Sequence, residues 1–329
     1  MKTNIIAKSL YGLALLMFGA AATSCDVHEW PKPDNEEQFR IELVFDTEFT
    51  DQYLYYTRAE AGERAMEYTV RAYPVINGTT DRETYKQTTF TRNVTDDYDC
   101  TAYIDLTPGE YHVMVWCDFL VDGKSYYDIT DFTKITVDTD PYTGNTENRL
   151  TFRGSVNIKV PTIKDLTNQE LTATVEMSSP MSRYIFVAND LEQFVNAQKE
   201  TSGGPVSLDD YYVTVVYPQF MPNAYNFFSG KPSDALAGIR FTSSLSNYTT
   251  GKAALGFDYV FVNGSESAIK VQMYVYRRAD NKEVARTPQI NVPTRRGLNV
   301  IVEGPFLSTQ SSDGVGIDPG YNGDINIYF

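Results

Sequence analysis

The residues of this 329-residue chain that could catalyse a reaction form no recognisable catalytic motif. The chain has two histidines, His28 and His112, and neither lies in a nucleophile motif such as G-x-S-x-G. Its three cysteines do not form the C-x-x-C spacing of redox and zinc sites. We therefore predict no catalytic residue, no metal, no cofactor and no enzymatic activity. A carboxylate pair for glycoside hydrolysis leaves no mark in a sequence of this kind, so that activity stays an alternative.

Cys25 is the residue with the clearest chemistry. Two lysines precede an apolar run over residues 10–22, which is too short to cross a bilayer, and small residues lead from it to the cysteine. This pattern is typical of a bacterial lipoprotein signal, cleaved so that the new N-terminal cysteine carries acyl chains such as palmitate. An ordinary secretory signal cleaved near residues 20–22 is the alternative. We predict a signal peptide over residues 1–24 and an outer-membrane lipoprotein at the cell surface.

The net charge and the lengths of the apolar runs limit which classes of partner the protein can bind. The formal charge of −15 becomes about −17 when Lys2 and Lys8 leave with the signal, which argues against nucleic acid. No second stretch approaches the roughly 20 apolar residues that a spanning helix needs, so the N-terminal lipid is the expected membrane contact. Residues 25–38 are rich in proline and acidic residues, and we interpret them as a lipidated tether.

Alternation of apolar and polar residues begins at Phe39 and predicts an all-β protein. The predicted strands cover residues 39–45, 67–75, 87–94, 99–106, 111–119 and 132–137, then 171–177, 184–188, 212–218, 257–262, 269–277, 289–293, 298–304 and 324–329. We assign them to two tandem β-sandwich domains, 39–160 and 161–329, divided in a polar segment around Pro161. One short helix, capped by Asp190, is inserted in the second domain, with Leu191, Phe194 and Val195 on one face.

The segment around Pro108 and Gly109 predicts a hairpin with a two-residue turn. That register places Cys100 opposite Cys117, in a pair whose Cα atoms approach to about 4.5 Å. An exported protein permits a disulfide there, worth roughly 3 kcal/mol in the chain-entropy model. Two buried thiols are the alternative.

Aromatic residues raise a second function, binding of glycans at the cell surface. Tyrosine is abundant and often paired, and Trp30 and Trp116 are the two tryptophans. Aromatic rings stack on sugars, although in strands they more often pack in the core. A surface glycan-binding lipoprotein is therefore the alternative to the assembly role that follows.

Several segments together resemble the fimbrillin superfamily of Bacteroidales, especially its lipoprotein anchor branch and an uncharacterised sister family. These segments are LTPGEYHVMVWCDF, YYDITDF, YTGNTENRLTFRGS, MSRYIFVANDLEQF, LGFDYVFVNG and RRGLNVIVEGPFLSTQSSDGVGIDPGYNGDINIYF. The resemblance implies two transthyretin-like β-sandwiches and a role as an anchor or accessory subunit of a fimbria or adhesive assembly. Its partners would be other fimbrial or surface subunits.

The resemblance also implies how such subunits join. Stalk subunits of the superfamily lose an N-terminal strand to an arginine-specific protease, whereas anchor subunits keep it; here Arg58 and Arg64 are the nearest loop arginines after the first strand. The groove accepts a C-terminal strand from the next subunit. Ile325, Ile327 and Phe329 alternate as a donated strand requires. A strand that completes its own sheet is the alternative.

Overall fold

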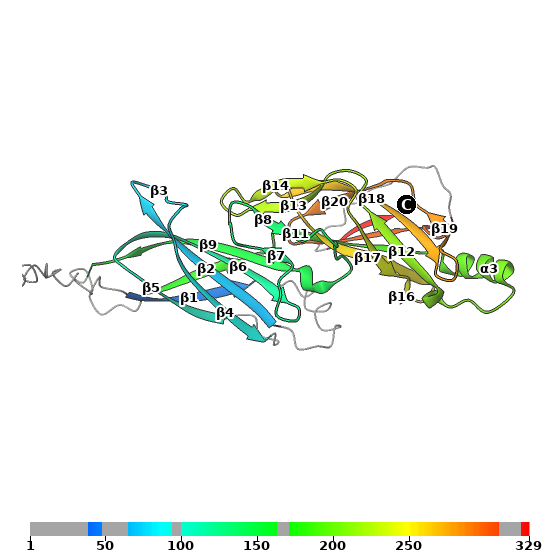
Figure 1. Cartoon of the computed structure of the whole chain (residues 1–329), viewed down its shortest axis with the longest axis horizontal. Coiled ribbons are helices and arrows are strands. Elements are labelled where there is room, and N and C mark those ends of the chain that lie inside the picture. The colour runs from blue at the N-terminus through cyan, green and yellow to red at the C-terminus, as the bar shows by residue number, and fades with distance from the viewer. Residues whose placement is uncertain (1–38, 48–64, 94–99, 163–170, 309–323, 329) are drawn as a thin grey trace, which may run out of the picture. The chain divides into compact units, whose positions relative to one another are not determined.

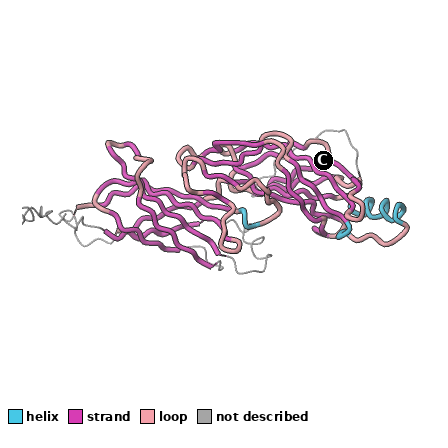
Figure 2. The backbone as a smooth tube through the Cα atoms, in the orientation of Figure 1, coloured by secondary structure: helices cyan, strands magenta, loops and turns pink. Residues whose placement is uncertain are grey.

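Strands make up most of the structure, a computed structural model (Figures 1 and 2). It describes residues 39–47, 65–93, 100–162, 171–308 and 324–328. The predictions for Cys25, Trp30, Arg58, Arg64 and Phe329 lie outside the described residues. Among the described residues, the α-helix is α3 (Leu191–Ser202). The prediction of an all-β fold with one short inserted helix is confirmed.

The N-terminal part contains two facing sheets. The larger has the order β3-β2-β6-β9 with β4 beside β2, and the smaller has the order β10-β1-β5. Their strands are β1 (Phe39–Thr47), β2 (Ala65–Ile76), β3 (Thr79–Thr80), β4 (Lys86–Asn93), β5 (Cys100–Leu106), β6 (Gly109–Leu120), β9 (Thr151–Val160) and β10 (Thr172–Met177). Between the sheets, the Tyr68 ring stacks on Phe45 and Phe90, with ring centroids 5.4 and 5.0 Å apart. This aromatic stack is part of the core that holds the two sheets together.

The larger sheet is also covered on its other face, which explains why β2 is buried along most of its length. A third sheet has the order β14-β13-β8-β7. Its strands are β7 (Tyr127–Asp128), β8 (Ile135–Val137), β13 (Met221–Asn226) and β14 (Lys231–Leu236). Trp116 of β6, fully buried, lies against Tyr127 and Tyr225 from this sheet. Because β8 pairs with β13, strands from both halves of the chain share one sheet.

The C-terminal part contains the remaining two sheets. One has the order β16-β17-β11-β21-β22, and the other has the order β15-β12-β18-β19 with β20 also paired to β18. Their strands are β11 (Met181–Ala188), β12 (Tyr211–Val216), β15 (Arg240–Ser244), β16 (Ser246–Thr249), β17 (Lys252–Phe261), β18 (Glu266–Arg277), β19 (Lys282–Arg286), β20 (Ile290–Arg295), β21 (Asn299–Gly304) and β22 (Asp324–Tyr328). The central strand β11 is buried at every position, as expected for a strand covered on both faces.

The predicted hairpin around Pro108 is wrong. The strand β5 pairs with β1, whereas β6 pairs with β2 and β9, so the turn at Pro108 joins two facing sheets. The alternating apolar positions of the two strands are nevertheless buried, namely Ala102, Ile104, Leu106, Tyr111, Val113 and Val115. An apolar face specifies which side of a strand is covered, and it does not specify the neighbouring strand.

Two further assignments change. The strand β10, grouped by sequence with the second domain, pairs in parallel with β1. The strand β9 was missed, because its polar residues and Gly154 indicate a linker. Gly154 is required for packing: a Cβ there would lie 2.5 Å from the carbonyl oxygen of Glu176, beside β10. The domain boundary at residue 160 stays a prediction. Strands from both sides of it share sheets, because β10 pairs with β1 and β13 pairs with β8.

The helix α3 begins where predicted, but its cap residue works differently. The Asp190 carboxylate makes no cap hydrogen bond. It accepts instead from the backbone N–H groups of Leu307 and Ser308, at 3.0 and 2.6 Å, just beyond β21. Asp190 therefore ties the start of the helix to the segment after β21.

Candidate functional site

The two cysteines lie on opposite sheets of the N-terminal part. Cys100 begins β5, opposite Phe45 of β1, and Cys117 of β6 pairs with Tyr68 of β2. The structure holds both as thiols. The hydroxyl of Tyr68 lies beside both sulfur atoms, and burial, with the two thiols, raises its pKa. The two cysteines are therefore not neighbours in a hairpin, but they approach each other between the two sheets. The disulfide itself stays a prediction.

The C-terminal strand β22 lies at the edge of its sheet. It pairs in parallel with β21, with Ile325 opposite Val300 and Ile327 opposite Val302. Among the described strands, β21 is its one neighbour. Its removal would therefore uncover an edge of β21 without separating two other strands.

Of the two tryptophans proposed for glycan contact, the structure describes Trp116. Trp116 is fully buried, and Tyr127 and Tyr211 are also in the core. A buried ring cannot stack on a sugar, so the assignment of Trp116 to glycan binding is wrong. Aromatic residues in this chain fill the space between sheets, as their β propensity favours.

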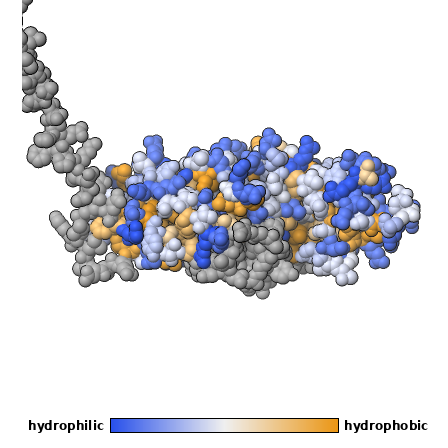
Figure 3. Space-filling model, turned by 60° about the horizontal axis from the view of Figure 1, so that its bottom comes forward, coloured by the Kyte–Doolittle hydropathy of each residue, from blue (hydrophilic) through white to orange (hydrophobic). Residues whose placement is uncertain are grey.

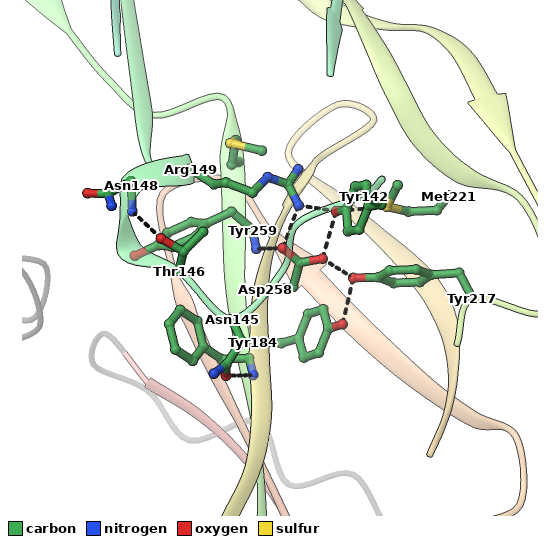
Figure 4. Close-up of polar contacts among 12 residues, drawn as sticks. Tyr142, Asn145, Thr146, Asn148, Arg149, Tyr184, Tyr217, Met221, Asp258 and Tyr259 are labelled. Carbon is green, nitrogen blue, oxygen red and sulfur yellow. Dashed lines mark hydrogen bonds and ion pairs between the residues drawn. The ribbon is translucent and has the colours of Figure 1, made fainter. Parts of the chain in front are cut away.

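The most elaborate polar arrangement is a buried network around the single-turn 3₁₀ helix η1 (Glu147–Arg149), which precedes β9 (Figure 4). Thr146 caps this turn by accepting a hydrogen bond from the N–H of Asn148 at 3.2 Å. The turn sends two opposite charges, Glu147 and Arg149, into the protein. We call this set of side chains the η1 network.

One arm of the η1 network is centred on Asp258 of β17. The Arg149 guanidinium donates to Asp258 Oδ1 at 2.6 Å, and each side chain is 1% exposed. The Tyr142 hydroxyl donates to Asp258 Oδ2 at 2.7 Å, and that of Tyr217 donates to the same oxygen. Because Tyr217 donates there, the Tyr184 hydroxyl must donate to Tyr217, at 2.6 Å. The backbone N–H of Tyr259 donates to Asp258 Oδ1 at 2.8 Å, so each carboxylate oxygen accepts two hydrogen bonds.

The second arm is centred on Glu147. Arg183 of β11 donates to Glu147 Oε1 at 2.9 Å and to the Asn299 side chain of β21 at 3.1 Å. The Tyr259 hydroxyl donates to the other oxygen of Glu147. The single turn η1 is thereby joined to β11, β17 and β21, three strands of a sheet formed by the C-terminal half.

The electrostatics of the η1 network follow from its burial. Burial raises the pKa of Asp258, while the Arg149 guanidinium and the Tyr217 and Tyr142 hydroxyls act in the opposite direction. The pKa of Arg149 lies well above its ordinary value, since Asp258 and the tyrosine oxygens outweigh the cost of burial. A paired and hydrogen-bonded charge of this kind is stable in a core, whereas a single one is not. The η1 network is closed to solvent, so its geometry suits positioning of strands and not turnover of a substrate.

The sequence contains no usable signal for the η1 network. Glu147 and Arg149 lie in a polar stretch that resembles an exposed loop, and their partners are about 35 to 110 residues away. Only the tyrosines at apolar positions of strands hint that polar atoms are buried nearby.

A recess of about 410 Å³ lies between the β2–β3 turn and strands β6 and β9. His112, Asn157 and Lys159 are among its polar lining residues. Burial lowers the pKa of His112, so its imidazole is neutral at pH 7. No group of three His, Cys, Asp or Glu residues with the geometry of a metal site occurs within the described ranges. None of the helices in those ranges is long and apolar enough to cross a membrane.

The chain belongs to a family of unknown function, DUF6562, whose model matches residues 33–328. No curated protein matches the chain. Matching solved structures include the fimbrial anchor protein Mfa2 from Porphyromonas gingivalis, with 10% identity, 75% of this chain and 82% of that chain covered, and a TM-score of 0.40. The tip fimbrial protein Mfa3 from the same organism matches with 10% identity, 78% and 81% coverage, and a TM-score of 0.38. At these values the structural matches assign no function to this chain.

Proposed function

We propose that this protein is a lipid-anchored, non-enzymatic cell-surface protein that serves as an anchor or accessory subunit of a fimbria or other adhesive assembly. The observation that carries the proposal is the order of elements: Cys25 ends a signal-like run, and the sheet-forming part begins at Phe39. The intervening residues 26–38, at about 3.3 Å per extended residue, span about 43 Å when fully extended. The lipid would therefore hold the N-terminal sheets close to the membrane.

Lipid attachment is tested by labelling cells with an alkyne analogue of palmitate. Cys25→Ser is expected to abolish the label and to release the protein from the membrane fraction, whereas the matched control Cys100→Ser keeps both. Label retained by Cys25→Ser would contradict the proposal.

The assembly role is supported by the edge position of β22, which could leave its own sheet and add to a partner subunit. Deletion of residues 324–329 is expected to abolish co-purification of partner subunits while the rest of the chain stays folded. Circular dichroism provides the folding control. Unchanged co-purification of the truncated protein would refute strand donation and leave the lipid anchor standing.

Glycan binding is a second candidate, favoured by the recess that His112 lines. A neutral imidazole beside an amide and an ammonium group offers donors and acceptors for sugar hydroxyls. On a glycan array, His112→Ala and Asn157→Ala are each expected to remove binding that the unaltered protein shows. Absence of any bound glycan, or binding unchanged in both variants, would reject this candidate.

A further inference from the structure

Strand β12 pairs with only the second half of β18. The two strands pair from Tyr211 opposite Arg277 as far as Val216 opposite Gln272. Continuation of that register would place Pro218 opposite Lys270, and proline has no N–H to donate to a ladder. At Tyr217 the chain instead bonds on its other side, where the Tyr217 N–H donates to the Ile239 carbonyl at 2.8 Å.

The first half of β18 is therefore paired along one edge. Strand β20 pairs with Glu266–Val271, and it continues the line of β19, which pairs with the second half. Tyr274 pairs with β12 and with β19, so these two strands lie on opposite sides of β18. No described strand occupies the β12 side of Glu266–Val271. The diverging strands form a fork with an open backbone edge.

A recess of about 490 Å³ fills this fork. It is lined by Pro218, Gln219, Phe220 and Ala237, by Ala268, Ile269 and Lys270 of β18, and by Asn291 of β20, which pairs with Lys270. At 3.3 Å per residue, the edge from Ala268 to Lys270 is about 10 Å long and matches three residues of an added strand.

The fork also exposes apolar side chains. Phe220, in its wall, is 74% exposed and is the most exposed large hydrophobic residue of the described chain. Leu236, which precedes Ala237 of the lining, is 41% exposed. An exposed aromatic ring beside a strand edge without a described partner is apolar surface that a bound ligand would cover.

Charge defines the occupant further. Lys270 is half-buried in the recess, and no ion pair involving it occurs within the described residues. An acidic side chain on the ligand would complete the pair, since opposite charge across a contact provides specificity. We propose that the fork between β12 and β18 binds an extended peptide with alternating apolar side chains and an acidic residue, which adds as a strand to the free edge at Ala268–Lys270.

The test uses the full chain, exported and purified in detergent, and phage-displayed random ten-residue peptides. Peptides are selected on the unaltered protein and counter-selected on the double variant Phe220→Ser/Lys270→Glu. We expect enriched peptides that alternate apolar residues around an Asp or Glu. No enrichment over the counter-selection, or enrichment without an acidic residue, overturns the proposal.

An enriched peptide is then synthesised with its acidic residue intact and with lysine in its place. Phe220→Ser and Lys270→Glu should each weaken binding of the acidic peptide at least tenfold, whereas exposed controls Tyr103→Ser and Lys231→Glu should not. Lys270→Glu should bind the lysine peptide better than the unaltered protein does. Equal effects of the control variants, or no charge reversal, would contradict the proposal.

Hydrogen exchange distinguishes strand addition from loose apolar contact. Peptide binding should slow amide exchange at Ala268–Lys270, because the free edge gains hydrogen-bond partners. Binding without this protection overturns the mode of recognition. Self-association of the protein that Phe220→Ser abolishes would identify a second copy as the occupant and overturn the assignment to a peptide.

Discussion

The η1 network and the fork between β12 and β18 both involve strands of the C-terminal half of the chain but use polar groups in opposite ways. In the η1 network, every oxygen of the Asp258 carboxylate has donors, and both charged side chains are almost completely buried. In the fork, no described strand pairs with the β12 side of Glu266–Val271, and the Phe220 side chain is mostly exposed. The comparison teaches that the η1 network holds strands in place, while the fork keeps a strand edge to which a further strand can be added. Figure 3 shows that, on the face it presents, hydrophobic residues form patches separated by hydrophilic ones.

The largest effect is expected from breaking the η1 network. Asp258→Asn leaves the Arg149 guanidinium buried without a counter-charge, which typically costs about 3–5 kcal/mol. Urea unfolding should show this loss as a lower midpoint. A loss well below 1 kcal/mol would mean that water reaches Arg149 and that the region is not closed.

The next effect is a pH dependence at Asp118 of β6. Burial raises its pKa to about 7, with Glu67 opposite it in the ladder adding repulsion, while the Ser125 hydroxyl donates to it and lowers the pKa. The folded state then binds a proton that the unfolded state has released between about pH 4 and pH 7. The free energy of unfolding contributed by Asp118 should therefore decrease as pH rises through that range, by about 1.4 kcal/mol per unit at most.

Unfolding in urea at pH 5 and pH 7.5 tests this for the unaltered protein and for Asp118→Asn. The variant should lose less stability between the two pH values, because its amide does not ionise. Identical changes in both proteins would assign the pH dependence to other groups.

A smaller effect is expected at an exposed ion pair. Lys134 donates to Asp234 at 2.9 Å, but their side chains are 52% and 44% exposed. Water and salt screen such a pair, so Asp234→Asn should lower the thermal midpoint far less than Asp258→Asn. Comparable losses in both variants would show that burial does not distinguish the two pairs.

The smallest effect on stability is expected at the fork itself. Phe220→Ser removes a ring that lies mostly in solvent and should change the free energy of unfolding by no more than about 0.5 kcal/mol. A large loss in thermal unfolding would show that Phe220 packs as part of the fold and is not kept for binding. Together with Asp258→Asn, this measurement tests the contrast between the two regions.

Strand positions were largely predictable, because period-two alternation is a local property. The strands β1, β2, β4, β5 and β6 lie where the pattern places them, within a few residues. Strands without a clear apolar face were missed, among them β14 and β16, which are exposed along much of their length. The helix α3 was predictable because its cap residue and its apolar face are also local features of the sequence.

Strand partners and buried polar sites were not predictable. Pro108 and Gly109 predict a turn, yet whether that turn returns the chain to the same sheet or passes it to the facing one depends on β1, more than 50 residues away. Likewise, Glu147 and Arg149 resemble loop residues until β11 and β17 supply Arg183 and Asp258.

The sequence by itself determined the strand-rich class, the inserted helix, the apolar faces, and the prediction of a lipidated Cys25, since each depends on neighbouring residues. The tertiary structure alone decided that β5 and β6 face each other across a core, that two ion pairs are buried beside β17, and that no described strand pairs with the β12 side of Glu266–Val271. The physical reason is the range of the interactions: alternation and signals are read within a few residues, whereas pairing and burial are settled between segments that meet only in the folded protein.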